Sequence, residues 1–256
     1  ESLEKALKGV SVAYYLIHSM NGGEGDFRKR DILAAQNFAR ACEKQGVERI
    51  IYLGGLGAQG GTRLSKHLQS RQQTGEALRS RSVPVTELRA AIIVGSGSAS
   101  FRIMRDLVRK LPIMLCPRWV QSRCEPIGIR QVLAYMTGCL TEPRTVGEIL
   151  EIGGGEVLTY EEMMRQTARE MGLKLRIIRV PVLTPKLSSY WLNLVTTVPI
   201  SIARPLVDGL KNDVVCHDHR IREWIEVPQI SFRQSVRRAL QSEKQETEET
   251  SWTDAR

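Results

Sequence analysis

The stretch RIIYLGGLGAQGG, residues 49–61, joins the pattern of a buried strand to a glycine-rich turn. Its apolar beginning is typical of a parallel strand that is covered on both faces. The turn itself, residues 55–60, has the G-x-G-x-x-G spacing of a dinucleotide-binding turn. The spacing alone leaves two interpretations open: a phosphate-binding turn, or a glycine-rich strand end of another kind.

The surroundings of this turn decide between the two. In the dinucleotide fingerprint the third glycine lies in the first turn of a helix, and an acidic residue or an arginine closes the next strand. Here three loop residues separate Gly60 from a helical pattern that begins near Leu64, and the next strand carries its only acid, Glu87, in the middle. A strand–helix unit over residues 10–45 already precedes the turn. We therefore interpret it as a glycine-rich strand end, which can still border a ligand crevice.

Strand and helix patterns alternate through the first half of the chain. Strands are predicted over residues 10–17, 47–53 and 85–94, and helices over residues 28–45, 64–81 and 101–110. Gly46 is placed as the C-cap of the first of these helices. The alternation predicts an α/β fold, a Rossmann-like parallel sheet with helices on both faces.

The second half is less regular and predicts a small C-terminal α/β lobe. Thr159 and Glu162 have the spacing of a capping box at the start of a helix, and LRIIRVPV, residues 175–182, has a strand pattern. Residues 183–210 are mostly helical in pattern, with a break at Pro199. We predict a first domain over residues 1–115, a lobe over residues 116–240 and a polar tail over residues 241–256.

Charge and composition limit the classes of molecule that the chain is expected to bind. The chain has 256 residues, a formal charge of +9 and 5% aromatic residues. Its lysines and arginines are scattered among acids and are not interleaved with aromatic residues, so no nucleic-acid partner is predicted. Residues 187–203 form the longest nearly uncharged apolar stretch, but Pro199 interrupts it. Core or lid helices are expected there; the alternative is weak contact of residues 187–210 with a membrane surface.

The cysteines indicate a reducing compartment. There are five, and none forms a C-x-x-C pair. The start of the sequence lacks the pattern of a secretory signal, so a cytoplasmic location is predicted. The motif CHDH, residues 216–219, would place two histidines on one face of a surface strand. Two such ligands do not complete a zinc site, and no metal is predicted.

Five stretches together resemble one family. They are VAYYLIHSM (12–20), NFARACEKQGVERIIYLGGLG (37–57), LSKHLQSRQQTGEAL (64–78), VPVTELRAAIIVGSGS (83–98) and PRWVQSRCEPIGIRQVLAYM (117–136). They are similar to the atypical, NmrA-like branch of the extended short-chain dehydrogenases/reductases. Within it they resemble bacterial NAD(P)H-binding proteins that carry a second C-terminal domain. The resemblance covers about residues 3–240.

The resemblance implies an arrangement of the sheet. The strands over residues 10–17, 47–53 and 85–94 would be the family's fourth, fifth and sixth. The family's own glycine turn follows its first strand, which would lie before Glu1. The chain is therefore expected to lack the first three strands, and the second domain would follow residue 256.

The resemblance also implies a dinucleotide cofactor, NADP or NAD, and the residues around it. The ribose region would be faced by His18, Ser19 and Met20. The nicotinamide would be bordered by Gly54, Gly55 and Leu56, and its pocket lined through the backbone by Arg89, Ala90, Ala91 and Ile92.

The family's catalytic pattern is absent. Ordinary members use a serine, a tyrosine that donates a proton, and a lysine that lowers the pKa of that tyrosine. Here a glycine stands at the serine position, and the helix reads SKHLQSRQQTGEAL without Tyr-x-x-x-Lys. Lys66, His67 and Arg71 are the remaining candidates for cationic or acid/base work. The alternative is structural, with Arg71 pairing to Glu76.

Two functions follow from the resemblance. The first is an NAD(P)-dependent oxidoreductase that acts on a small or hydrophobic carbonyl or quinone-like molecule. The second is a non-catalytic NAD(P)H-binding module, either a redox sensor or an assembly subunit. The missing serine and tyrosine favour the second, and the strand-end glycines suit cofactor binding in both.

Overall fold

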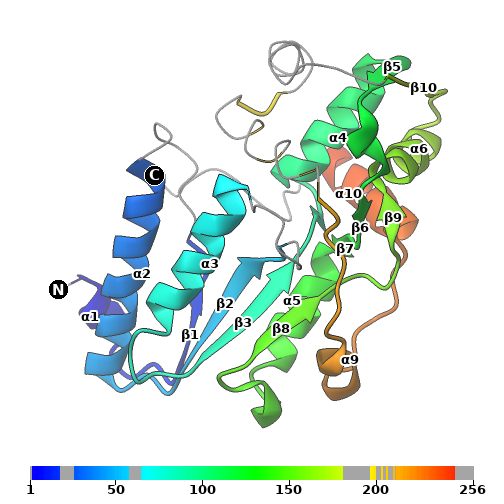
Figure 1. Cartoon of the computed structure of the whole chain (residues 1–256). Coiled ribbons are helices and arrows are strands. Elements are labelled where there is room, and N and C mark those ends of the chain that lie inside the picture. The colour runs from blue at the N-terminus through cyan, green and yellow to red at the C-terminus, as the bar shows by residue number, and fades with distance from the viewer. Residues whose placement is uncertain are drawn as a thin grey trace.

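The computed structural model describes residues 2–17, 26–57, 65–180, 197–199, 203, 206, 210 and 212–245. Its main sheet is wholly parallel (Figure 1). The strand order is β1 (Val12–Tyr15), β2 (Arg49–Gly55), β3 (Val85–Ala90) and β8 (Ile149–Ile152). This confirms the predicted α/β fold with a parallel Rossmann-like sheet.

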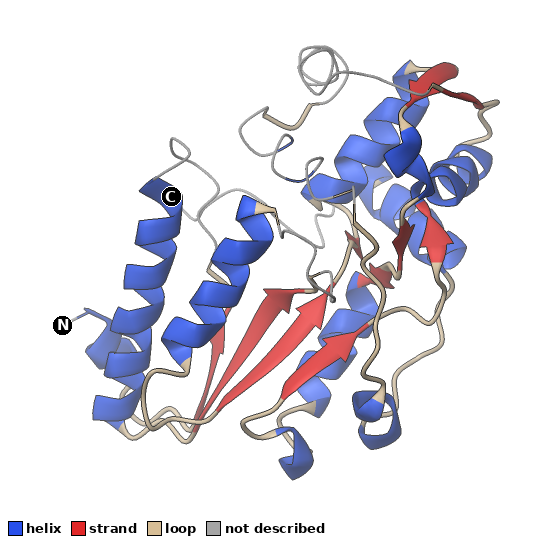
Figure 2. Cartoon of the chain, viewed as in Figure 1, coloured by secondary structure: helices blue, strands red, loops and turns tan. Residues whose placement is uncertain are grey.

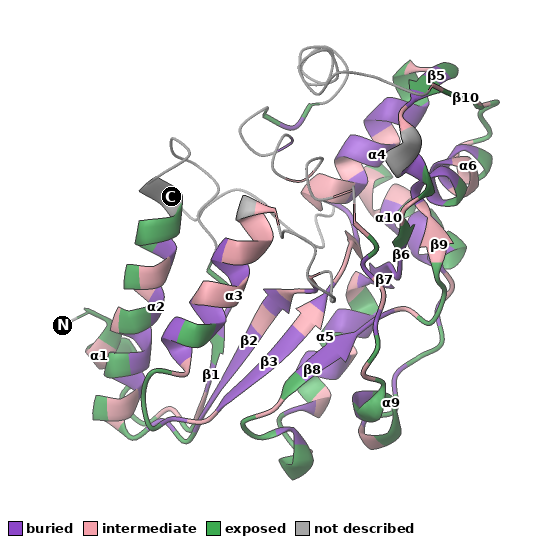
Figure 3. Ribbon diagram, viewed as in Figure 1, coloured by how far each residue is buried: buried purple, intermediate pink, exposed green. Residues whose placement is uncertain are grey.

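Helices cover both faces of this sheet (Figure 2). On one face lie α2 (Asp26–Gln45) and α3 (Lys66–Leu78); on the other lie α5 (Ile129–Gly138) and α9 (Arg220–Trp224). Successive strand side chains point to opposite faces, so Ile50 and Tyr52 pack towards α2 and α3 while Ile51 packs towards α5. The short helix α1 (Ser2–Ala6) contacts α2. Figure 3 shows the strands buried between these layers.

The second lobe is built around three helices, α4 (Ala99–Lys110), α6 (Tyr160–Glu170) and α10 (Phe232–Lys244). Two short strand pairs complete it. β5 (Ile113–Cys116) runs parallel to β10 (Arg176–Arg179), and β6 (Arg123–Cys124) runs antiparallel to β9 (Leu158–Thr159). Two 3-10 turns, Arg118–Gln121 and Pro143–Thr145, lie in the connections.

Local signals in the sequence are confirmed at two helix ends. Gly46 follows α2 with a φ of 71°, the left-handed conformation that glycine adopts without strain. At α6 the backbone N–H of Glu162 donates to Oγ1 of Thr159 at 3.2 Å, and the N–H of Thr159 donates to Oε2 of Glu162 at 2.7 Å. The predicted capping box is therefore present.

Other predictions are wrong in detail. The strand predicted over residues 85–94 divides: β3 ends at Ala90, and β4 (Ile93–Val94) pairs with β7 (Ile127–Gly128) outside the main sheet. The motif CHDH, residues 216–219, is not a strand, because the N–H groups of Cys216 and His217 donate to the buried carboxylates of Glu125 and Glu151.

The predicted boundaries of the parts differ from the elements that the structure shows. β8 falls within residues 116–240 yet pairs with β3 in the main sheet. α10 continues to Lys244, past the predicted start of the tail at residue 241. Most of residues 183–210 lie outside the described residues. Among the described helices, none has the length and apolar character needed to cross a membrane.

A buried carboxylate fixes the distance between α3 and the sheet. Glu87 in β3 is 1% exposed and forms ion pairs with Arg79 and, at 2.8 Å, with Arg89. Gly75 in α3 lies directly over it, since a Cβ at position 75 would stand 2.4 Å from Oε2 of Glu87. α3 can therefore approach this closely only with a glycine at that turn.

Replacing Gly75 by alanine tests this contact. Helix propensity alone would stabilise the protein by about 1 kcal/mol. We expect instead a loss of about 1–3 kcal/mol in the free energy of unfolding, because the new methyl group displaces a buried ion-paired carboxylate. Urea unfolding measures the difference. The exposed neighbour Glu76→Ala is the control and should change stability by about 0.5 kcal/mol or less. A G75A variant more stable than the wild type would contradict the packing described.

Candidate functional site

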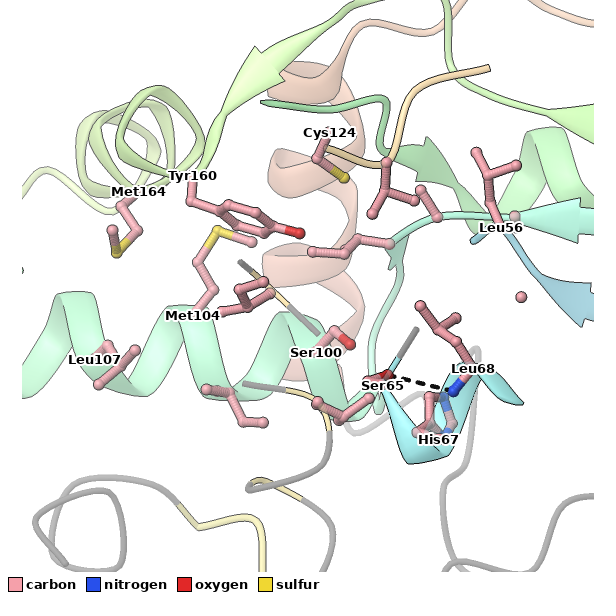
Figure 4. Close-up of a pocket in the computed structure, with 18 residues that line it drawn as sticks. Leu56, Ser65, His67, Leu68, Ser100, Met104, Leu107, Cys124, Tyr160 and Met164 are labelled. Carbon is pink, nitrogen blue, oxygen red and sulfur yellow. Dashed lines mark hydrogen bonds between the residues drawn. The ribbon is translucent and has the colours of Figure 1, made fainter. Parts of the chain in front are cut away.

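A cavity of about 150 Å³ lies between the carboxyl ends of β2 and β3 and the second lobe. Figure 4 shows its lining, with Leu56, Leu68 and His67 on the side of the sheet and Met104, Tyr160 and Cys124 on the side of the lobe. A volume of this size admits about one aromatic ring. The carboxyl ends of parallel strands are where open α/β sheets bind ligands.

The sheet forms one wall because β2 and β3 end at the same level. The N–H of Leu56 donates to the carbonyl oxygen of Ala90 at 2.7 Å, which closes the strand pair. The chain then leaves the sheet at Ala91, and Ile92 follows along the cavity. Gly55 leaves room for the adjoining helix, since a Cβ there would lie 3.0 Å from Cδ2 of Leu68.

The first turn of α3 forms the neighbouring wall. Ser65 is its N-cap, and its Oγ accepts a hydrogen bond from the N–H of Leu68 at 3.3 Å. This cap directs Leu68 and His67 to the cavity, where both are half-buried. α3 begins at Lys66, and Gly60 lies outside the described residues. The interpretation of GLGAQG as a glycine-rich strand end therefore stays a prediction.

The lobe supplies the opposite wall. Ile103, Met104 and Leu107 come from α4, and Tyr160 and Met164 from the first turns of α6. Tyr160 directly follows the N-cap Thr159. The capping box therefore also fixes the position of the Tyr160 backbone at the cavity. Tyr160 is 6% exposed and lies between Met104 and Cys124 in Figure 4.

Among the described lining residues, His67 is the one whose side chain becomes a cation near neutral pH. The described lining contains no lysine, arginine, aspartate or glutamate. Burial raises the pKa of the Cys124 thiol to about 12. Burial, with a contribution from the neighbouring Cys124, also raises the pKa of Tyr160 well above its usual value. Both groups are therefore neutral near pH 7, and the site is suited to an uncharged molecule.

The structure brings together five of the residues expected to border a cofactor: Gly55, Leu56, Ala90, Ala91 and Ile92 all line the cavity. The remaining two described residues of that set lie elsewhere. A Cβ at Gly54 would meet Oε1 of Glu87 at 3.1 Å, and the side chain of Arg89 pairs with Glu87 on the face towards α3. His18, Ser19 and Met20 lie outside the described residues.

The three catalytic candidates occupy different environments. His67 lines the cavity, and the side chain of Lys66 lies outside the described part of the chain. Arg71 is 9% exposed; its guanidinium donates to the carbonyl oxygen of Leu53 and makes a longer contact of 3.5 Å with that of Ile17. It also lies 4.9 Å from the centre of the Tyr52 ring. Arg71 thus joins the ends of β1 and β2, and its guanidinium is bonded to these carbonyl oxygens and not to Glu76.

The contribution of the lobe to the cavity has little signal in the sequence. Met104, Cys124, Tyr160 and Met164 lie in stretches whose patterns indicate ordinary core faces. Their shared role appears only when the chain folds, because α4, β6 and α6 meet at the end of a sheet to which none of them belongs. The one local signal is the capping box, which places Tyr160 at a helix start.

Comparisons with known proteins agree with the fold. No protein-family model and no curated protein sequence matches the chain. Solved structures do match. A nucleoside-diphosphate-sugar epimerase from Staphylococcus aureus has a TM-score of 0.71 at 14% identity, over 92% of this chain and 79% of its own.

Two further structures show the same similarity. Citrobacter sp. triphenylmethane reductase complexed with NADP(H) has a TM-score of 0.69 at 17% identity, over 93% of this chain and 79% of its own. The Bordetella bronchiseptica enzyme WbmG in complex with NAD and UDP has a TM-score of 0.72 at 15% identity, over 100% of this chain and 81% of its own. At these identities the similarity establishes the fold, that of NAD(P)-dependent epimerases and reductases.

Substitutions at Arg71 and His67 separate a structural role from a place at the cavity. Arg71→Met keeps much of the aliphatic stem but removes the charged hydrogen bonds to strand-end carbonyls. We expect a loss of about 2 kcal/mol in the free energy of unfolding. His67→Ala should change it by about 0.5 kcal/mol or less, because the side chain is half-buried at the cavity wall. Urea unfolding of both variants measures this, and equal losses would contradict the assignment.

Proposed function

We propose that the chain is an NAD(P)H-dependent oxidoreductase of the short-chain dehydrogenase/reductase type. Its substrate is a small, uncharged, apolar carbonyl or quinone-like molecule that meets the nicotinamide at this cavity. The observation that carries this proposal is the mostly apolar cavity at the carboxyl ends of β2 and β3, where α/β sheets bind ligands.

The proposed cofactor is NAD or NADP, because structures with this fold bind them and the cavity residues fit a nicotinamide ring. Structures of this fold are described in complex with NAD or with NADP(H). The described residues fit the nicotinamide end of such a molecule, because Gly55 and Leu56 offer backbone close to an apolar wall formed by Ala90, Ala91 and Ile92. When bound, the nicotinamide supplies the hydride. The protein holds the substrate beside it and excludes water.

The finer family assignment is also a proposal. We place the chain in the NmrA-like branch, in a bacterial cytoplasm, with β1 and β2 as the family's fourth and fifth strands. The outer edge of β1 has no strand beside it among the described residues, and the family's first three strands would lie there. The family's second domain would follow residue 256.

The mostly apolar lining favours one substrate class over another. A nucleotide sugar carries phosphate charges, and a buried charge needs a paired partner. No lysine or arginine stands in the described lining, so His67 alone would have to pair with both phosphates of a diphosphate. An apolar ring meets leucine, isoleucine and methionine side chains instead. The proposed substrate therefore resembles a dye or a quinone in polarity more than a nucleotide sugar.

Tyr160 supplies the polar contact in this apolar site. Its phenol stays protonated near neutral pH and is hydrogen-bonded to the Cys124 thiol at the cavity wall, so its O–H would have to turn from the sulfur to an entering carbonyl oxygen. We assign it to the carbonyl oxygen of the substrate, where it orients the molecule and stabilises the negative charge that develops as hydride arrives. Because its pKa is raised and not lowered, Tyr160 would act from the lobe as a hydrogen-bond donor, and not as the proton donor that the tyrosine of α3 is in ordinary members.

A second function is favoured by the absence of Tyr-x-x-x-Lys in α3. The chain would then bind NAD(P)H without turnover, as a redox sensor or an assembly subunit. In this case the same residues would contact the cofactor, and the cavity would bind no substrate.

Turnover with defined probes tests these proposals. NADPH and NADH are titrated by calorimetry, and cofactor oxidation is followed with a benzoquinone, an aromatic aldehyde and a UDP-sugar. We expect cofactor binding and turnover of the uncharged probes only. Tyr160→Phe should lower kcat by about 10- to 100-fold at unchanged cofactor affinity, because one hydrogen bond to the developing oxyanion is lost.

A cavity-filling variant locates the substrate. Ser100, half-buried on the first turn of α4, lines the cavity, and Ser100→Trp should raise KM for the uncharged probes about tenfold or more. Leu33→Trp, at a residue 58% exposed on α2, is the matched control and should leave KM unchanged. Turnover of the UDP-sugar alone would contradict the substrate class. Cofactor binding without any turnover would support the second function, and no binding would contradict both.

A further inference from the structure

The outer face of the ribbon formed by β5 and β10 exposes apolar side chains. Ile113 and Leu115 of β5 are 57% and 51% exposed, and Ile178 of β10 is 49% exposed. The parallel register sets Leu115 beside Ile178, so the three side chains share one face. Met114 and Cys116 point the other way, into the core of the lobe. The three exposed residues form the ribbon patch.

Cations gather where the two strands of the ribbon begin. Arg109 and Lys110 end α4 just before β5, and Lys174 precedes β10. Arg176 lies beside Ile113 in the register and is exposed. These four residues form the basic rim of the ribbon patch.

The acidic residues close to the basic rim are paired mainly with other arginines, so they do not neutralise its positive charge. Asp106, which lies 3.8 Å from Arg109, is fully buried and is bonded mainly to Arg105 and Thr197. Glu161 pairs with Arg179 at 2.9 Å and with Arg165, so Arg179 is not counted in the rim. Lys110, Lys174 and Arg176 form no ion pair among the described residues.

We propose that the ribbon patch docks on an anionic membrane surface. Aliphatic side chains on an exposed face enter the boundary between headgroups and acyl chains, and lysines and arginines around them attract anionic lipids. The patch offers both elements side by side on two adjacent strands. Figure 1 places β5 and β10 at the end of the lobe away from the main sheet, where no other described element stands over them.

Charge favours a membrane over a second copy of the chain. In a two-fold dimer through this face the same four cations of each copy would meet. The chain as a whole carries +9, which adds to the repulsion. An anionic bilayer would attract these cations, whereas a second copy of the chain would repel them.

The docking site and the cavity are joined by one helix. α4 contributes Ile103, Met104 and Leu107 to the cavity and ends at Lys110 in the basic rim. At 1.5 Å per residue the helix separates Met104 from Lys110 by roughly 9 Å along its axis. Docking would bring the cavity near a reservoir of apolar molecules. The docking itself does not depend on the proposed reaction.

Vesicle flotation with the full chain tests the docking. We expect association with vesicles of equimolar phosphatidylcholine and phosphatidylglycerol, and little with phosphatidylcholine alone. The triple variant Lys110→Gln, Lys174→Gln and Arg176→Gln should weaken association with the anionic vesicles by about 100-fold, from the usual contribution of a basic residue near such a surface. The triple variant Ile113→Ser, Leu115→Ser and Ile178→Ser should weaken it by about tenfold or more.

Matched controls change exposed residues elsewhere in the fold. Lys5→Gln with Lys8→Gln removes exposed cations near α1, and Leu33→Ser with Leu140→Ser removes exposed leucines of other surfaces. These variants should float like the wild type, and circular dichroism checks that every variant is folded. Equal flotation of wild type and patch variants would overturn the proposal. So would sedimentation that shows a dimer abolished by the serine variant, with no vesicle association.

Discussion

The carboxylate of Glu87, buried in the middle of a parallel strand, is the constraint on which the site depends. It is held by Arg79 from the end of α3 and by Arg89 from its own strand, so its charge is paired on both sides. The two nearest glycines, Gly75 above it and Gly54 beside it, leave the room that it occupies. α3 is thereby fixed against β2 and β3 at one height. This position of α3 along the strands places its first turn, with Leu68 and His67, beside the strand ends, where it forms a wall of the cavity.

A second buried carboxylate holds the lobe side of the fold together. Glu125, 2% exposed, accepts hydrogen bonds from the N–H groups of Gly155 and Cys216, each at 3.1 Å, and pairs with Arg222 of α9. It therefore links the loop after β8, the segment near residue 216 and the helix behind the sheet. Gly153 is needed beside it, because a Cβ there would stand 2.4 Å from Oε1 of Glu125. Both carboxylates lie outside the cavity lining, which lets the cavity itself remain mostly apolar.

Local patterns predicted the sheet well because each buried strand is a short apolar run between turn residues. The strand within RIIYLGG, the glycine C-cap at Gly46 and the capping box at Thr159 all act within a few residues of chain. The division after Ala90 could not be predicted in this way. AAIIV continues the apolar pattern of β3. Its last two residues leave the main sheet because they form β4, which pairs with β7 from a distant part of the sequence. The strand-end residues Gly55, Leu56 and Ala90 to Ile92 were expected at the site from the family resemblance, whereas Tyr160 and Met104 were not.

The distribution of charge then separates the surfaces of the protein by their chemistry. Buried acids are matched with arginines: Glu87, Glu125 and Glu161 each take one or two guanidinium partners. The cavity is left with a phenol and a thiol that burial keeps protonated, so an uncharged ligand can enter it without leaving a charge unpaired. Arg49 and Arg71 are buried and donate to neutral oxygens, whereas at the β5–β10 ribbon the cations are exposed beside aliphatic residues. A protein arranged in this way can meet an anionic surface with one end of α4 and hold an apolar molecule against the other.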